Sequence, residues 1–152
     1  MTKQPDPAFL ALVDTHEETL LRASRLLTGD WDLADELLRD TLSWALVSWK
    51  SLARNGLGPL RTRQRLVAAY LISQPPDEPG ESATDDAEPE RSDPTQPLLA
   101  ALARLDPVDR ATVVAQYYLG LSAAEIGEIL GREEADVADA AVEALRELGW
   151  PG

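Results

Sequence analysis

The stretch that decides the expected fold of this 152-residue chain is LSAAEIGEILG, residues 121–131. Ser122 and Glu125 have the spacing of a capping box, in which each side chain accepts a hydrogen bond from the other residue's backbone N–H at a helix start. The apolar residues after it fall on one helical face: Ile126, Ile129 and Leu130. Gly131 can adopt the positive φ that ends a helix, so the stretch predicts a short helix that stops in a turn.

A second amphipathic helix is expected after this turn. Its apolar residues repeat at the spacing of a buried stripe: Val137, Ala141, Leu145 and Leu148. Gly149 and Pro151 then end it, and Gly127 is expected to be small because the second helix passes close to it. Two such helices around a glycine-containing turn form the helix-turn-helix of DNA-binding proteins, although a plain helical hairpin has the same spacing.

The second helix carries the wrong charge for DNA. From Arg132 to Leu148 there are six acidic and two basic residues. DNA affinity comes largely from Lys and Arg side chains that neutralise phosphates, and base edges are read mainly by Arg, Lys, Asn and Gln. The outward face of this helix is therefore expected to be repelled by DNA, and DNA binding should be weak or absent.

The whole chain shares this acidity, with a net charge of −13. Such a field repels nucleic acid and anionic membranes and suits basic partners. With no Cys, no apolar run of membrane length and no signal-peptide pattern, a cytoplasmic location is expected. No nucleophile triad, phosphate loop or paired-carboxylate motif occurs, and His16 lies on an apolar stripe. Neither an enzyme nor a metal or cofactor site is therefore expected.

The acidic residues gather in the middle of the chain. Residues 75–96 hold eight acids, one base, several prolines and no apolar side chain larger than Ala. Such a segment cannot bury enough apolar surface to fold, so it is expected to be a disordered acidic linker. We therefore expect an all-α protein of two small helical domains, residues 1–74 and 97–152, with the helix-turn-helix in the second.

Apolar periodicity predicts three helices in the first domain and four in the second. The first three are expected over about residues 6–27, 31–52 and 59–74. Asp30 is expected to be the N-cap of the second helix, and Pro59 to lie in the first turn of the third. Two more helices are expected before the helix-turn-helix, over about residues 98–105 and 106–120.

Motifs in both halves resemble the small two-domain sigma factors of bacterial RNA polymerase, the extracytoplasmic-function group. In the first half, RLLTGD at residues 25–30 and ADELLRDTL at residues 34–42 resemble the second region of that family. In the second half, LARLDP at residues 102–107 and YYLGLSAAEI at residues 117–126 resemble its fourth region. The resemblance implies a helical transcription protein whose partners are the RNA polymerase core and anti-sigma factors.

The sequence departs from the family where the family contacts DNA. Five positions on the expected recognition helix differ from the family's usual threonine, lysine, serine, arginine and arginine: Asp136, Ala138, Asp139, Ala140 and Glu143. The third helix also runs into Pro75 and Pro76, where the family usually continues into a basic run. The promoter role that the resemblance implies therefore does not carry over to this chain.

The helix that binds polymerase in the family keeps its acids here. The residues expected to bind polymerase or an anti-sigma factor are Asp35, Glu36, Arg39, Asp40 and Trp44. Arg39 and Trp44 stand where the family usually has glutamine and arginine. Trp44 falls off the apolar stripe of its helix, so it is expected either to be an exposed interface anchor or to pack between the two halves.

Three arginines on the third helix are candidates for residual phosphate contacts: Arg61, Arg63 and Arg65. The sequence favours a solvated helix face as the explanation of this cluster, and pairing with the acidic linker is a further alternative. Taken together, the residues and the resemblance predict a sigma-factor-like regulator that acts by protein contact and has lost promoter recognition. The alternatives are a working sigma factor with atypical promoter contacts and a helical interaction module unrelated to transcription.

Overall fold

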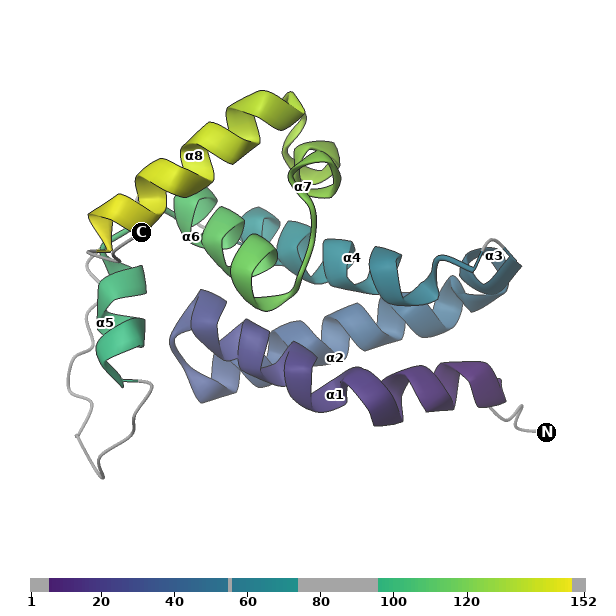
Figure 1. Ribbon diagram of the computed structural model, residues 1–152. Helices are drawn as coiled ribbons and strands as arrows, with labels where there is room; N and C mark the ends of the chain where they lie inside the picture. The colour runs from purple at the N-terminus through teal and green to yellow at the C-terminus, as the bar shows by residue number, and fades with distance from the viewer. Residues whose placement is uncertain (1–5, 55, 74–95, 149–152) are drawn as a thin grey trace.

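The computed structural model describes residues 6–54, 56–73 and 96–148, and every regular element in these ranges is a helix. The expected all-α class is confirmed. In Figure 1, α4 lies between the pair formed by α1 and α2 and the helices of the C-terminal half. Among the described residues, none of the helices combines the length and the apolar character that crossing a membrane requires, and no group of three His, Asp or Glu side chains is placed to hold a metal ion.

The first two helices are joined by the tight turn that the sequence predicts. The α1 helix spans Pro7–Thr28, and Gly29 ends it with a φ of 75°. The α2 helix spans Trp31–Val47. The Asp30 carboxylate caps it by accepting from the backbone N–H groups of Asp32 and Leu33, at 2.7 and 3.1 Å. The expected N-cap is therefore confirmed.

The expected single helix over residues 31–52 is wrong, because it breaks at Ser48. A separate short helix, α3, spans Trp49–Arg54, and α4 follows at Gly58–Ser73. The break places the buried Trp49 ring edge-on to Phe9, with 5.5 Å between ring centroids. The same indole covers the start of α4, where a Cβ added to Gly58 would lie 2.6 Å from it. The helix therefore breaks where Trp49 packs against Phe9 and Gly58. Apolar periodicity does not reveal this break.

The C-terminal half begins with α5 at Gln96–Ala103 and α6 at Pro107–Val113. Gln96, the last residue of the expected linker, thus belongs to a helix, and residues 75–95 lie outside the described residues. The expected helix over residues 106–120 is only partly right, because its second half is a π-helical turn, η1, at Val114–Tyr118. This wider turn leaves Tyr117 and Tyr118 exposed on the surface.

The helix-turn-helix is formed by α7, Ala123–Leu130, and α8, Glu134–Glu147. The capping box between Ser122 and Glu125 is present, and Gly131 ends α7 with a φ of 70°. The expected reason for Gly127 needs a correction. A Cβ there would lie 3.8 Å from Val137 of α8, as expected, but only 2.5 Å from the carbonyl oxygen of Arg132, so the backbone of the turn is the closer neighbour.

The two halves share one hydrophobic core. Its fully buried members come from residues 6–73 and from residues 96–148. They include Leu20, Leu27, Leu66, Leu102 and Ile126. A smaller cluster joins the start of α1 to the end of α2 and to α3. It includes Phe9, Ala45, Trp49 and Leu52. The sequence left open whether the halves pack together, and in this structure they do. The division into domains at residues 75–96 stays a prediction.

Candidate functional site

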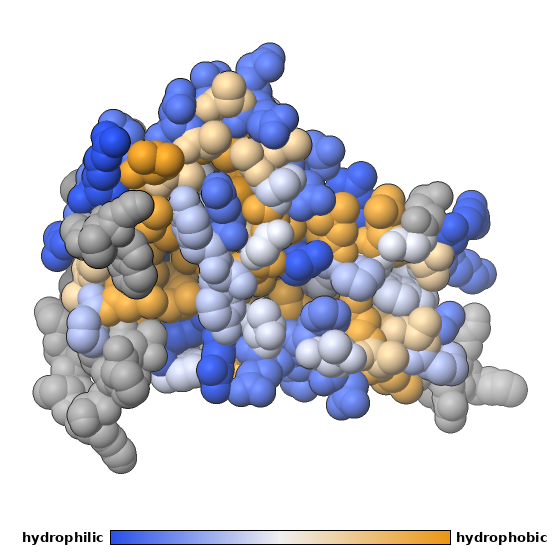
Figure 2. Space-filling view, in the orientation of Figure 1, coloured by the Kyte–Doolittle hydropathy of each residue, from blue (hydrophilic) through white to orange (hydrophobic). Residues whose placement is uncertain are grey.

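The expected recognition helix presents an acidic surface. On α8, Asp136, Ala138, Asp139 and Glu143 are exposed and Ala140 is half-buried. The opposite face is buried through Val137, Ala141 and Ala144. Figure 1 shows α8 along the outer edge of the molecule, and in Figure 2 this edge carries mostly hydrophilic residues. The candidate DNA-facing positions are thus accessible, and three of the five are acids.

Further carboxylates lie close to α8, around Asp109 of α6. Burial raises the pKa of Asp109 on α6, and the nearby carboxylates of Asp106 and Glu147 raise it further. Arg132 counteracts the shift but is a weaker influence. A polyanion that approached α8 would therefore meet a region in which carboxylates already repel one another.

The acids of α2 face a different way and border a pocket. Asp35, Glu36, Arg39 and Asp40 are all exposed. Arg39 donates to Asp35 at 2.8 Å, one helical turn away, so these two charges pair with each other. Glu36 and Asp40 instead line a cavity of about 320 Å³ together with apolar side chains that include Leu27, Leu33, Leu37 and Ala69. We call this cavity the acidic pocket.

The C-terminal half contributes Arg110 to the acidic pocket. Its Nε donates to the Leu26 carbonyl at the end of α1, at 2.8 Å. Burial lowers the pKa of Arg110 and raises that of Tyr70, which lines the same pocket. The partner surface predicted on α2 is therefore bordered by a residue from α6, which the sequence gave no reason to expect there.

Trp44 does not lie with the α2 acids. It is half-buried, and the Arg65 guanidinium carbon lies 5.3 Å from the centroid of its ring. It lines a shallower cavity of about 240 Å³, which we call the tryptophan pocket, between α2, α4 and α7. Glu128 and Ile129 of α7 form the opposite wall. Trp44 thus packs against the smaller cluster around Phe9 and Trp49 and also borders α7 across the tryptophan pocket, and its role as an interface anchor stays a prediction.

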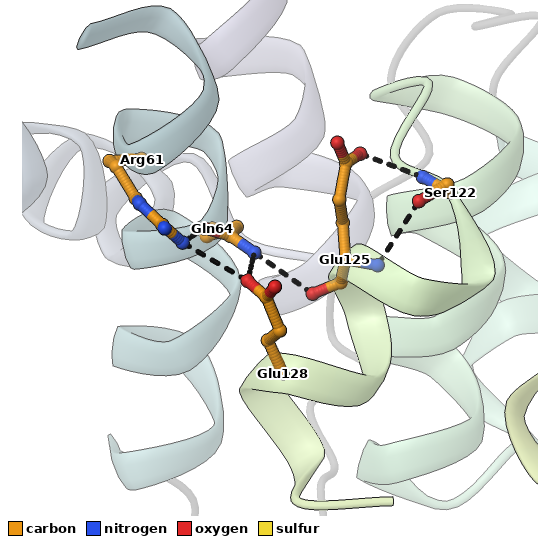
Figure 3. A network of polar contacts seen from close by, with 5 residues as sticks. All are labelled: Arg61, Gln64, Ser122, Glu125 and Glu128. Carbon is orange, nitrogen blue, oxygen red and sulfur yellow. Dashed lines mark hydrogen bonds and ion pairs between the residues drawn. The ribbon is translucent and has the colours of Figure 1, made fainter. Parts of the chain in front are cut away.

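One candidate phosphate-binding arginine, Arg61, contacts the C-terminal half in Figure 3. Arg61 forms an ion pair of 3.1 Å with Glu128 of α7. Next to it, the buried amide of Gln64 donates to the Glu128 carboxylate at 3.0 Å and to the Glu125 carbonyl at 2.9 Å. Hydrogen bonds from Gln64 and Arg61 lower the pKa of Glu128. Arg61, one of the three candidates for phosphate contact, is therefore paired with a carboxylate.

The remaining arginines are also engaged at this boundary. Arg63 donates to the Leu119 carbonyl, at 2.9 Å, just after η1. Arg65 stacks on Trp44. Gln64 and Arg110 also link the two halves, as Arg61 and Arg63 do, but they were not among the candidates. A polar residue on an amphipathic helix gives no sign of its tertiary partner, so the sequence held no signal that would have selected them.

Comparison with known families covers the C-terminal half. Residues 95–148 match the family model described as Sigma-70, region 4, which takes in α5 to α8 and the whole helix-turn-helix. No curated protein matches the chain. The matched segment agrees with the fourth-region motifs at residues 102–107 and 117–126. The C-terminal segment of the chain, residues 95–148, is therefore similar to region 4 of the sigma-70 family.

Proposed function

We propose that this protein is a sigma-factor-like regulator that acts by protein contact, on core RNA polymerase or an anti-sigma factor, and that it no longer recognises promoter DNA. The observation that carries the proposal is the exposed face of α8. It presents Asp136, Asp139 and Glu143 where a DNA-reading helix needs cations or amides. Two basic residues accompany this helix. Arg132 precedes α8, and Arg146 lies in its last turn.

The magnitude of the electrostatic term supports the loss of DNA recognition. Each phosphate neutralised by Lys or Arg contributes roughly 0.9 to the slope of log affinity against log salt. A face whose outward charges are carboxylates makes no such contribution, and the net charge of −13 adds long-range repulsion. The scaffold of region 4 thus persists without the side chains that give it affinity for DNA.

The contacts of α4 favour this proposal over a working sigma factor with atypical promoter contacts. That alternative relies on Arg61, Arg63 and Arg65 to bind phosphate. Arg61 is paired with Glu128, and Arg63 donates to a backbone carbonyl. A phosphate at either arginine would have to compete with the contacts that its Nη1 group already makes.

The α2 surface supports the choice of a protein partner. Glu36 and Asp40 border the acidic pocket, and Leu33 beside them is 51% exposed. Acids around an apolar patch suit a basic partner with apolar side chains of its own. The surface residues of α2 therefore remain our candidates for the contact with polymerase or an anti-sigma factor.

The first test concerns DNA. The purified protein should show no duplex-DNA binding even at low salt, where phosphate contacts are strongest. A variant with Asp136→Thr, Ala138→Lys, Asp139→Ser, Ala140→Arg and Glu143→Arg should gain weak binding that salt abolishes. Fluorescence anisotropy of a labelled duplex measures both. Micromolar binding by the unaltered chain at moderate salt would contradict the proposal and favour the working sigma factor.

The second test concerns the partner surface. Trp44→Ala should weaken capture of purified core RNA polymerase, or of the cognate anti-sigma factor, by about 2 kcal/mol if the ring is buried in the complex. Asp40→Ala should have a smaller, salt-dependent effect, as expected for a charge at an interface rim. Binding is measured by surface-immobilised titration, with circular dichroism to check folding.

Trp31→Ala is the matched control for Trp44→Ala. Trp31 lies on the same helix and is 54% exposed, with Arg25 stacked on its ring at 4.4 Å. It should leave capture unchanged. Equal losses from the two substitutions, or a loss from Trp31→Ala alone, would place the partner surface elsewhere.

A further inference from the structure

The acidic pocket has the size of a small-molecule site and takes its walls from both halves. Its volume is about 320 Å³, at the lower end of the roughly 300–1,000 Å³ that is usual for such sites. The end of α1, one face of α2 and the last turns of α4 supply most of the lining, and α6 supplies Arg110. A cavity of this size suits a compact organic molecule.

The floor of the pocket is apolar and its mouth is charged. Leu27 and Leu37 are buried members of the shared core, and Ala69 packs against it. Glu36 and Asp40 are exposed at the mouth. An occupant therefore needs an apolar body that can cover the floor and a polar group that meets the two carboxylates.

The α6 wall offers a guanidinium group with free donors. The Arg110 side chain is half-buried, and its only hydrogen bond among the described residues runs from Nε to the Leu26 carbonyl, at 2.8 Å. Neither of its unpartnered Nη groups is a fully buried atom. Because a guanidinium group stays charged in proteins, these Nη groups can donate a pair of charge-assisted hydrogen bonds to a carboxylate.

The two carboxylates of the mouth are also unpaired. Asp35 forms an ion pair with Arg39, but Glu36 and Asp40 form none with any described residue, Arg110 included. Opposite charges thus line one cavity without neutralising each other. A molecule with an amine at one end and a carboxylate at the other would pair with both.

The hydroxyl groups of the lining leave this choice to the charges. Thr28 and Ser73 already donate to backbone carbonyls, those of Ser24 and Tyr70. Burial raises the pKa of Tyr70 and the charge of Arg110 counteracts it, so the phenol lies near the guanidinium group. The Tyr70 ring therefore marks the Arg110 end of the pocket, and Leu33, which is 51% exposed, marks the mouth.

We infer that the acidic pocket binds a small ω-amino carboxylate, with its carboxylate at Arg110 and its amine between Glu36 and Asp40. The apolar chain of the ligand would lie over Leu27 and Leu37. One end of the ligand would be held by the C-terminal half and the other by the N-terminal half. The inference does not depend on the proposed function, since it concerns a small molecule and not DNA or a protein partner.

The probe is 6-aminohexanoate, because its extended length is close to the diameter of a sphere with the volume of the pocket. Titrated into the full chain, it should shift the NMR signals of the Leu27, Leu37 and Ala69 methyls. A dissociation constant of about 1 mM is expected for so few atoms. Hexylamine, which lacks the carboxylate, should bind about tenfold more weakly. Hexanoate, which lacks the amine, should bind about two- to fivefold more weakly, because the mouth is exposed to solvent.

The orientation is tested without any substitution. Intermolecular nuclear Overhauser effects should connect the methylene next to the carboxylate of 6-aminohexanoate to the Tyr70 ring. The methylene next to its amine should show them to the Leu33 methyls. The reversed pattern would overturn the assignment.

A pair of variants tests the carboxylates of the mouth. Glu36→Gln with Asp40→Asn should reduce the affinity for 6-aminohexanoate to that for hexanoate. The matched control, Asp14→Asn with Glu17→Gln, removes the same charge from exposed positions of α1 outside the pocket. It should keep the preference for 6-aminohexanoate, and an equal loss in both variants would contradict the inference.

The guanidinium group is tested by Arg110→Met. The variant should lose the preference for 6-aminohexanoate over hexylamine while it still binds hexylamine, which also shows that the pocket still forms. Binding of the three probes with equal affinity by the unaltered chain, no binding, or shifts outside the pocket lining would each overturn the inference. The proposed function would survive all of these outcomes, because the DNA and partner measurements test it separately.

Discussion

Leu66→Ala should lower the free energy of unfolding by about 2–5 kcal/mol, the range for a leucine truncated in a well-packed core. Leu66 is fully buried on α4 and belongs to the cluster formed by residues of both halves. The cavity would therefore lie at the packing boundary between the halves. Chemical denaturation followed by circular dichroism measures the loss, and amide hydrogen exchange shows where it is felt. The protection of backbone amides against hydrogen exchange should fall in both α1 and α8.

Ile72→Ala is the matched control on the same helix. Ile72 is 76% exposed, so its truncation should change the free energy of unfolding by less than about 0.5 kcal/mol. If Leu66→Ala reduced protection in α1, α2 and α4 while α7 and α8 kept theirs, the common core would not be a single cooperative unit.

Gly127→Ala should destabilise the helix-turn-helix even though alanine is the better helix former. The exchange gains about 1 kcal/mol of helix propensity within α7. It also places a Cβ 2.5 Å from the Arg132 carbonyl oxygen, which belongs to backbone and cannot turn aside. Overpacking of this kind costs about 1–3 kcal/mol, and the turn must open to relieve it. Thermal unfolding should show a net loss.

Ala124→Gly provides the comparison for the glycine exchange. Ala124 is exposed on the same helix, and the reverse substitution there should cost about 1 kcal/mol through helix propensity alone. If Gly127→Ala raised the melting temperature, propensity would outweigh the contact, and the close approach of the turn would not constrain this position.

Local signals predicted the fold well because they act over a few residues. Asp30 and Ser122 cap α2 and α7 as expected, and Gly29 and Gly131 end α1 and α7 with positive φ. Each of these features depends on a side chain and backbone groups within four residues of it. Such features form in any context that leaves the segment helical, so spacing alone is enough to recognise them.

Features that depend on distant neighbours were missed or misplaced. The break at Ser48 accompanies the packing of Trp49 on Phe9 and Gly58, and η1 interrupts a helix that has no Pro or Gly between residues 108 and 119. At the candidate site, the exposure of the α2 and α8 acids followed from their polarity. The position of Trp44 beside Arg65 depends on how α2 packs on α4, and the role of Gln64 at α7 depends on how the two halves meet.

Glu125 joins two structures that are usually thought of separately. Its side chain completes the cap of α7 by accepting from the Ser122 backbone N–H, at 2.9 Å, while its carbonyl oxygen accepts from Gln64 on α4. A substitution of this side chain would leave the carbonyl group in place but loosen the helix turn that aims it. Loosening the first turn of α7 would therefore weaken the hydrogen bond from Gln64. The packing of α4 on α7, a segment 61 residues further along the chain, would then lose its alignment.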